Sequence, residues 1–409
     1  MFWKSVLSVL TGTAVAQAIP IIASIAIARL YSVETFGLYS AWLAVVLILS
    51  VVLTGRYELA IAVVASGKER ALALWVAIIF VFITGIILAT LYFILSLFEF
   101  FGDNALSSEM LVLLIPAGMV MAFSQIIQSM LAANGDYRKL SFFRILQALL
   151  MVIPQITMGY WNNSAIYLAL SHLVGVTIAL SIIIPFIAEF KQSGITKNKL
   201  MYFFKRHYKF PVFSLSGGLM NSLSAQLPVI VITSNFGAEH GGVLALTMRT
   251  LGAPIGILGK SILDVFKKHA GDEYRLTGAC NKIYMNTFYY LSLSSLFFSV
   301  FLFFFSEILF TTLFGKEWGE AGKIAVLLIP LFALRFIASP LSYVIYIVEK
   351  QQVALVWQTI LLVMTFAVFY SNLSFVDMVL FYSLGYAGLY LIYIRLTYMM
   401  SLPKNQATL

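Results

Sequence analysis

The strongest constraint on this chain is an apolar run, repeated many times, that is long enough to cross a lipid bilayer. The runs are about 20 to 27 residues long, and a transmembrane α-helix needs about 20. They lack the short apolar and polar alternation of transmembrane β-strands. With 61% hydrophobic and 11% charged residues, the composition lies far outside that of water-soluble domains. The sequence therefore predicts an all-α integral membrane protein.

About twelve spans can be read along the chain, separated by turn-forming and charged residues. The predicted spans are 5–29, 38–64, 71–96, 109–132, 142–161, 165–189, 210–234, 241–265, 283–306, 323–348, 352–371 and 375–398. The longest basic connection falls between the sixth and seventh spans. We therefore predict two six-helix lobes, residues 1–190 and 210–409, joined by a cytoplasmic basic linker over residues 191–209.

Lys and Arg in the connections predict the orientation, because short cytoplasmic loops are enriched in these residues. Basic residues gather on alternate connections, which places both termini in the cytoplasm. The residues on that side include Lys4, Lys68, Arg70, Arg138, Lys139, Arg144, Lys191 to Lys209, Lys267, Lys268, Arg275, Lys282, Lys350, Arg395 and Lys404. The formal net charge of +9 follows mostly from this topology and gives no indication of nucleic-acid binding.

No signature of an enzyme is present in the sequence. The four histidines (His172, His207, His240 and His269) are scattered, and they form no metal-ligand spacing with the single Cys280. No phosphate-cradling glycine loop and no nucleophile elbow occur. We therefore predict a protein that is not an enzyme and that holds no cofactor and no metal.

Arginines inside the apolar runs are the main functional signal. Arg56, Arg249 and Arg335 fall within predicted spans, where a central charge costs about 2.5 to 3.5 kcal/mol on insertion scales. Arg29 closes the outer end of the first span. All four are candidates for substrate binding. For Arg29 the alternative is an interfacial anchor, and for Arg249 and Arg335 it is a structural ion pair or a carbonyl clamp.

Glu58 lies two residues after Arg56 in the second predicted span. On a continuous helix, residues two apart point to different sides, so we expect that the two charges cannot neutralise each other without partners on other helices. Glu58 is a candidate for coupling transport to H⁺ or Na⁺, or for bracing an arginine. Three deep arginines against one glutamate predict a cationic central cavity between the lobes.

A cationic cavity in a membrane favours an anionic substrate. Guanidinium groups bind phosphate oxygens through two parallel hydrogen bonds. A phosphate-bearing headgroup with an apolar tail fits both the arginines and the lipid surroundings, because the tail can stay in the bilayer.

Several segments of the chain together carry a family resemblance. They are TGTAVAQAIP at 11–20, ARLYS at 28–32, FG at 36–37, TGRYELAI at 54–61, FGKEW at 314–318, EKQQ at 349–352 and WQ at 357–358. These segments resemble the bacterial polysaccharide transport family, the Wzx-type O-antigen flippases. The likeness covers nearly the whole chain and is strongest in the first sixty residues.

This resemblance implies a member of the multidrug/oligosaccharidyl-lipid/polysaccharide exporter (MOP) superfamily, with twelve to fourteen helices in two lobes around a central cavity. Similar proteins of the bacterial inner membrane move undecaprenyl-diphosphate-linked oligosaccharides, such as O-antigen units of lipopolysaccharide, from the cytoplasmic to the periplasmic leaflet by alternating access. Polysaccharide assembly proteins are the expected partners besides the lipid bilayer. The family's cationic cavity carries over only to Arg29 and to the Gly55-Arg56-Tyr57-Glu58 segment.

Two alternatives remain open at this point. A drug or organic-ion exporter of the same superfamily would share the fold, but its pocket should be acidic or apolar. An integral-membrane glycan polymerase or ligase would use arginines too, but it should carry a long periplasmic loop with catalytic Arg or His. The longest outward loop expected here, near residues 307–322, contains no histidine.

Overall fold

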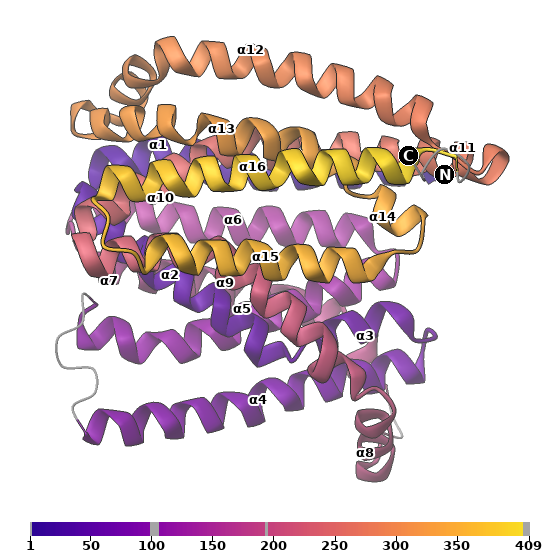
Figure 1. The fold of residues 1–409 in the computed structure, drawn as a ribbon. Coiled ribbons are helices and arrows are strands. Elements are labelled where there is room, and N and C mark those ends of the chain that lie inside the picture. The colour runs from indigo at the N-terminus through magenta and orange to yellow at the C-terminus, as the bar shows by residue number, and fades with distance from the viewer. Residues whose placement is uncertain (1, 99–105, 193–194, 404–409) are drawn as a thin grey trace. The chain divides into compact units, whose positions relative to one another are not determined.

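The computed structural model describes residues 2–98, 106–192 and 195–403, with side chains except at 2–14, 260, 261, 264 and 351. Every regular element in these ranges is a helix (Figure 1). By internal packing the chain divides into an N-terminal unit, Met1–Gly242, and a C-terminal unit, Val243–Leu409. The chain ends, residue 1 and residues 404–409, lie outside the described ranges, so the cytoplasmic position of the termini stays a prediction.

The all-α membrane prediction is confirmed. Eleven helical segments of the described chain are long and apolar enough to cross a bilayer. They are Val33–Thr54, Lys68–Leu97, Ser108–Ala133, Tyr137–Gly159, Ala165–Phe186, Phe210–Phe236, Ala238–Gly259, Asn281–Phe314, Lys316–Ile347, Gln352–Phe369 and Phe375–Ser401. The first predicted span corresponds to α1 (Phe2–Leu30), in which the stretch Val15–Leu30 is also apolar.

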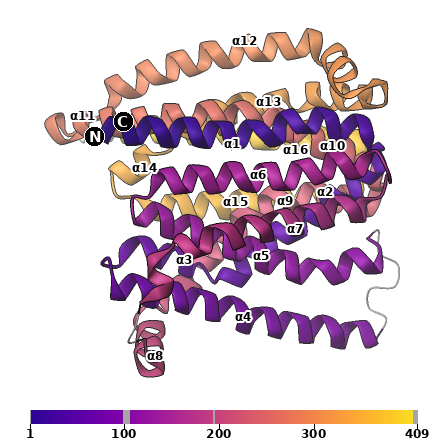
Figure 2. The same cartoon turned by 180° about the vertical axis from the view of Figure 1, so that it is seen from behind.

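The N-terminal unit holds α1 and the helices that follow it. These are α2 (Val33–Thr54), α3 (Tyr57–Val63), α4 (Lys68–Leu97), α5 (Ser108–Ala133), α6 (Tyr137–Gly159), α7 (Ala165–Ile183), α8 (Lys197–Arg206), α9 (Leu215–Phe236) and the start of α10 (Ala238–Pro254). Short 3₁₀ turns follow α7 (η1, Ile184–Phe186; η2, Ala188–Lys191), and a π-helical turn, η3 (Phe210–Ser214), leads into α9. Figure 2 shows α1 along α6, with which it packs, whereas α2 contacts α5 and α9.

Local sequence explains how α2 begins and how closely it can pack. The Ser32 hydroxyl accepts a hydrogen bond from the Thr35 amide at 3.2 Å, which caps the first turn. Gly37 lets α2 approach the start of α10, because a Cβ at this position would lie 1.8 Å from the Ala238 carbonyl oxygen. Small residues at such crossings are typical of helix contacts in membranes.

The C-terminal unit contains the rest of α10 and the helices after it. They are the π-helical turn η4 (Ile255–Gly259), α11 (Lys260–Thr277), α12 (Asn281–Phe314), the 3₁₀ turn η5 (Lys316–Trp318), α13 (Gly319–Leu341), α14 (Val344–Ile347), α15 (Gln351–Phe369) and α16 (Phe375–Ser401). Helix α13 packs against both α12 and α16. Polar contacts tie these helices together: the Ser295 hydroxyl donates to the Ala333 carbonyl at 3.0 Å, and the Ser383 hydroxyl accepts from the Leu331 amide at 3.4 Å.

One predicted span differs from the structure, and the predicted linker contains a helix. The predicted span 38–64 is not one helix, since α2 ends at Thr54 and α3 begins at Tyr57. The predicted linker, residues 191–209, contains the amphipathic helix α8. The two six-helix lobes with boundaries at 190 and 210 stay a prediction.

Candidate functional site

A left-handed turn separates α2 from α3 at two consecutive residues. Gly55 has φ 53° and Arg56 has φ 62°. Glycine is needed first, because a Cβ at residue 55 would lie 2.3 Å from Phe80 Cε1. A non-glycine residue in this region costs of order 1 to 3 kcal/mol, and such strain is concentrated at functional sites. Arg56 is therefore held in an unfavourable backbone conformation that fixes where its side chain points.

The turn brings Arg56 and Glu58 together, which corrects the expectation that they point apart. One terminal guanidinium nitrogen, Nη1, lies 3.3 Å from Glu58 Oε1. The expectation assumed a continuous helix, whereas two left-handed residues redirect the chain before α3 begins. The Glu58 side chain is 5% exposed and that of Arg56 is 28% exposed, so the acid is buried behind the arginine.

Part of this ion pair remains unsatisfied. Arg56 Nε and Glu58 Oε2 are buried and have no hydrogen-bond partner among the described residues. The guanidinium group lies against the backbone of α9, since a Cβ on Gly218 would come within 2.8 Å of Arg56 Nε. An unpaired buried donor costs about 1 to 3 kcal/mol, and more when the group is charged. A ligand oxygen that accepts from Arg56 would relieve this cost.

Tyr57 locks the other side of the turn. Its side chain is buried, and its ring lies 5.3 Å from that of Phe80 on α4 and 5.7 Å from that of Phe204 on α8. The Tyr57 hydroxyl also donates to the Phe204 carbonyl at 3.5 Å. Arg56 is thus anchored to α4 and α8 through its neighbour in the sequence.

A polar seam inside the N-terminal unit was missed by the sequence interpretation. On α5, the Gln125 amide donates to the Ser50 hydroxyl of α2 at 2.9 Å. Arg144 Nε of α6 donates to Gln128 Oε1 at 2.9 Å. The sequence interpretation counted Arg144 as a loop charge, although it lies in the second turn of α6. The signal that could have found it is the helical spacing of Gln125, Gln128 and Ser124 on one side of α5.

The seam continues through a second set of contacts between α5 and α6. The Ser124 hydroxyl donates to Gln147 Oε1 at 2.9 Å and accepts from the Gln128 amide at 3.1 Å. Amide side chains carry donors and acceptors without a net charge. Neutral amide and hydroxyl groups therefore form the part of the seam that lies next to Gln128, the acceptor of Arg144.

Buried His172 belongs to a separate network. Its Nδ1 lies 2.9 Å from the Tyr39 hydroxyl, which accepts from the Gln155 amide at 3.0 Å. The network links α2, α6 and α7, so this histidine connects helices inside the unit. Among the residues that the structure describes, no three His, Cys, Asp or Glu side chains are grouped to hold a metal ion.

Arg335 occupies a different setting in the C-terminal unit. It lies in the interior of the span Lys316–Ile347 and is half-buried. Its positive charge interacts electrostatically with the hydroxyl groups of Tyr382 and Tyr390 on α16, so these side chains lie nearby. The ion pairs found among the described residues do not include Arg335. Among the described residues, its charge therefore lies near phenol groups and forms no ion pair with a carboxylate.

A row of aromatic side chains extends along α16 from this arginine. The rings of Tyr382 and Tyr386 are 4.6 Å apart, and those of Tyr386 and Tyr390 are 6.1 Å apart. Trp357 of α15 stacks on Tyr393 at 4.2 Å with an interplanar angle of 19°. The Tyr386 hydroxyl lies 2.9 Å from Thr365 Oγ1, so part of the row is fixed by hydrogen bonding.

The other two predicted arginines lie apart from these features in the sequence. Arg29 is exposed in the last turn of α1, where a cation interacts favourably with the helix dipole. Arg249 is half-buried near the middle of the span Ala238–Gly259 and belongs to the C-terminal unit. The structure therefore pairs Arg56 with Glu58, and a shared cavity for all four arginines stays a prediction.

Comparison of the sequence with models of known protein families identifies the family. A model described as polysaccharide biosynthesis protein matches residues 26–323. The chain belongs to this family. This agrees with the resemblance seen in the sequence. No curated protein sequence matches the chain.

Several solved structures share the fold of this chain. An inward-facing multidrug resistance MATE family transporter matches with a TM-score of 0.72 and 16% identity, over 94% of this chain and 94% of its own. The lipid II flippase MurJ, in an inward closed conformation, matches with a TM-score of 0.75 and 14% identity, over 96% of this chain and 89% of its own. At these identities the likeness shows the fold.

A third match is a MOP superfamily transporter from Pyrococcus furiosus Vc1, for which reverse polarity of the binding pocket suggests a different function. It has a TM-score of 0.58 and 15% identity, over 97% of this chain and 95% of its own. The fold neighbours are transporters and a flippase, not enzymes. This polysaccharide biosynthesis protein is accordingly a multi-pass membrane protein with a transporter fold.

Proposed function

We propose that this protein is a flippase for an undecaprenyl-diphosphate-linked oligosaccharide, such as an O-antigen repeat unit. The substrate moves from the cytoplasmic to the periplasmic leaflet of the bacterial inner membrane as two lobes alternate their access. The polysaccharide biosynthesis family supports a glycan substrate, and the fold shared with a lipid II flippase supports a lipid-linked one. Both termini and the basic helix α8 lie on the cytoplasmic side in this scheme.

One observation carries the proposal: the side chain of Arg56 is 28% exposed, and its buried Nε lacks a partner among the described residues. Phosphate oxygens are strong acceptors, and arginine binds them through two N–H groups in a fixed geometry. The strained turn and the contact with Gly218 hold the group ready before the substrate arrives. A diphosphate at the exposed part of Arg56 would give the guanidinium group acceptors that Glu58, which lies 3.3 Å from Nη1, does not supply.

Arg335 and Arg249 supply further positive charge from the C-terminal unit in this scheme. The tyrosines near Arg335 add hydroxyl groups and ring faces. Such groups suit a sugar, which offers hydroxyls and apolar C–H faces. Arg29 guides the anionic headgroup from the end of α1. The prenyl tail stays in the bilayer, where it needs no polar partner.

Glu58 braces Arg56 in this proposal. Its buried carboxylate lies 3.3 Å from the guanidinium group and limits the directions in which that group can turn. Coupling to H⁺ or Na⁺ through Glu58 is the alternative role. The two roles differ in their response to a gradient, because a bracing carboxylate need not exchange its proton during transport.

A drug exporter is the rival function, and the MATE fold favours it. Organic cations need an acid or an apolar pocket. The buried acid Glu58 is already paired with Arg56, so the N-terminal unit presents a cation. A polymerase or ligase is disfavoured by the fold neighbours, which are transporters and a flippase.

The experiment is a flipping assay in liposomes that contain the purified protein and a fluorescent undecaprenyl-diphosphate oligosaccharide. Headgroup accessibility to a membrane-impermeant reductant is followed with and without a proton gradient. Protein-dependent movement supports the proposal. Absence of movement, together with efflux of a cationic dye from the same liposomes, would replace it by the drug exporter.

A further inference from the structure

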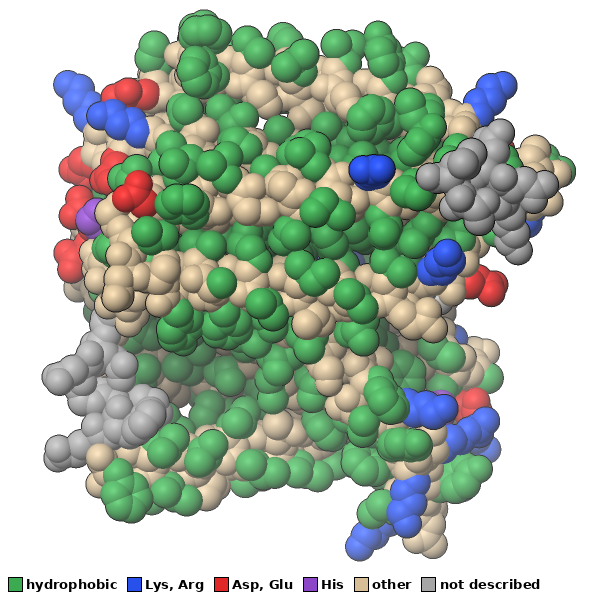
Figure 3. Space-filling view, in the orientation of Figure 1, with side chains coloured by type: hydrophobic (Ala, Val, Ile, Leu, Met, Phe, Trp, Pro, Cys, Tyr) green, Lys and Arg blue, Asp and Glu red, His purple; other side chains and the backbone are tan. Residues whose placement is uncertain are grey.

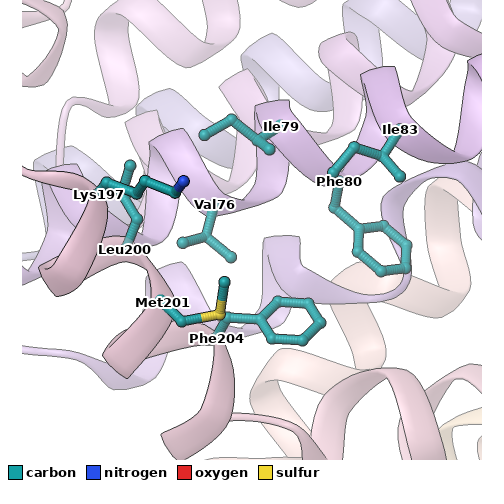
Figure 4. Close-up of a pocket in the computed structure, with 8 residues that line it drawn as sticks. All are labelled: Val76, Ile79, Phe80, Ile83, Lys197, Leu200, Met201 and Phe204. Atoms are coloured by element: carbon teal, nitrogen blue, oxygen red, sulfur yellow. The ribbon is translucent and has the colours of Figure 1, made fainter.

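An apolar groove lies between α4 and α8 in the N-terminal unit. Figure 1 shows α8 across the end of the unit where α4 begins. The groove has a volume of about 270 Å³ and is lined by Ile79, Phe80 and Ile83 of α4 and by Met201 and Phe204 of α8. Lys197 lies at one end of these walls, as Figure 4 shows. The groove is therefore an apolar channel with a cation at one end.

The walls of this groove face outward. Ile83 and Met201 are 54% and 50% exposed, although both are apolar. Helix α4 is a membrane span, so its exposed apolar side chains meet lipid. The volume is slightly below the roughly 300 to 1,000 Å³ of small-molecule sites, which suits part of a hydrocarbon chain better than a bulky headgroup.

The charge of α8 complements an anionic headgroup. The helix contains Lys197, Lys199, Lys205 and Arg206 and has no acidic residue. Figure 3 shows basic side chains gathered in the lower right of the view, where α8 lies. A basic amphipathic helix at the membrane surface attracts anionic lipids of the cytoplasmic leaflet.

We propose that this groove binds one anionic phospholipid of the cytoplasmic leaflet. An acyl chain lies between α4 and α8 against Ile83 and Met201, and the headgroup phosphate pairs with Lys197. No residue of the Arg56 turn lines the groove, and the existence of the site does not depend on the proposed substrate.

The lipid site touches the Arg56 turn through two shared side chains. Phe80 and Phe204 line the groove, and both pack against Tyr57. A bound acyl chain restricts these two rings and with them Tyr57, the residue after Arg56. The phospholipid therefore stabilises the strained turn that holds the candidate substrate-binding arginine.

Native mass spectrometry of the delipidated full-length protein in detergent micelles tests the site. The protein is titrated with phosphatidylglycerol and, separately, with phosphatidylcholine. We expect one tightly bound phosphatidylglycerol, with an affinity about fivefold or more above that for phosphatidylcholine. Lys197→Glu should abolish this preference. Lys199→Glu makes the same charge change on the same helix outside the groove lining and should reduce the preference much less.

A second variant tests the apolar part of the site. Met201→Trp adds bulk at an exposed position that lines the groove, so it should reduce binding of both phospholipids about fivefold or more. Equal affinity for the two lipids, or equal effects of Lys197→Glu and Lys199→Glu, would overturn the proposal. Tighter binding of undecaprenyl phosphate in competition with phosphatidylglycerol would also overturn it, because the groove would then belong to the substrate tail.

Discussion

The two units bury an arginine in different ways. In the N-terminal unit, Arg56 is fixed by a strained turn and an ion pair with Glu58 at 3.3 Å. In the C-terminal unit, Arg335 lies among tyrosines, and no ion pair of the described residues includes it. A carboxylate partner offsets the charge and restricts the geometry, whereas phenol groups leave the charge in place. Under the proposed function, we therefore expect precise phosphate binding at Arg56 and a more general attraction of anions at Arg335.

Among the variants that test this difference between Arg56 and Arg335, Arg56→Ala should have the largest effect. Arg56→Ala should lower the rate of flipping about 10- to 100-fold, since a hydrogen bond to a charged group contributes about 1.5 to 3 kcal/mol and 1.4 kcal/mol is tenfold. The liposome assay with fluorescent undecaprenyl-diphosphate oligosaccharide measures this rate. Arg138→Ala removes an exposed arginine at the start of α6 and should leave the rate unchanged. Equal rates in the two variants would contradict the role of Arg56.

Removing Arg335 should have a smaller effect, of about tenfold, because Arg249 still contributes charge from the same unit. If Arg335 acts mainly as a charge, Arg335→Lys should restore most of the rate, whereas Arg56→Lys should not, because lysine lacks the fixed fork of donors. Arg395→Ala, at an exposed position of α16, is the matched control. A wild-type flipping rate in Arg56→Lys would show that Arg56, like Arg335, acts only through its charge.

Gly218 gives a way to move Arg56 without deleting it. A Cβ on Gly218 would lie 2.8 Å from Arg56 Nε, so Gly218→Ala should displace the guanidinium group. Crowding of this kind costs about 1 kcal/mol or more, which predicts a loss of flipping of about fivefold or more. Gly388→Ala, where no atom lies within 4 Å of the new Cβ, should keep the wild-type rate. Wild-type flipping in Gly218→Ala would show that the contact with α9 is unimportant.

Glu58→Gln separates bracing from coupling. The amide keeps the shape and an acceptor but removes the charge, so the brace should weaken and the rate should fall about fivefold at most. Any stimulation by a proton gradient should persist, because Glu58 does not carry the transported proton in this account. Comparison of the rates with and without the gradient, in both proteins, measures this. Loss of gradient stimulation in Glu58→Gln alone would assign coupling to Glu58.

The smallest effect concerns the reactivity of the cysteine that precedes α12. Burial and the nearby Glu273 raise the pKa of Cys280 to about 11, and its side chain is buried. The reactive thiolate is therefore scarce at neutral pH, and maleimide should label native Cys280 slowly. Cysteine placed at exposed Lys199 should label quickly from the cytoplasmic side. Rapid labelling of Cys280 in the native protein would contradict the first expectation. Labelling of the Lys199→Cys variant only from the periplasmic side would contradict the second.

The spans could be predicted from the sequence because long apolar runs leave few alternatives in a bilayer. The break at Gly55 and Arg56 could not be predicted, because the residues on both sides of it are apolar. The left-handed turn packs against Phe80 of α4 and Gly218 of α9, and Tyr57 at the start of α3 packs on Phe80. The same tertiary contacts explain why Arg56 and Glu58 meet although helical spacing separates them.

The partners of polar side chains could not be predicted from the sequence either. Arg144 lies near a run of basic loop residues, and only the fold shows that it donates to Gln128 of α5. The row of tyrosines on α16 is visible in the sequence as aromatic content, but its position beside Arg335 requires the packing of α13 against α16. Hydropathy predicts which segments enter the membrane, whereas the partners of polar side chains depend on helix packing.

The central claim is that Arg56 holds the diphosphate, and a binding measurement tests it most directly. The affinity of the purified protein for undecaprenyl diphosphate in detergent micelles is compared between the wild type, Arg56→Ala and Arg138→Ala. The account predicts that the Kd rises about tenfold or more in Arg56→Ala and stays at the wild-type value in Arg138→Ala. An unchanged Kd in Arg56→Ala would contradict the account.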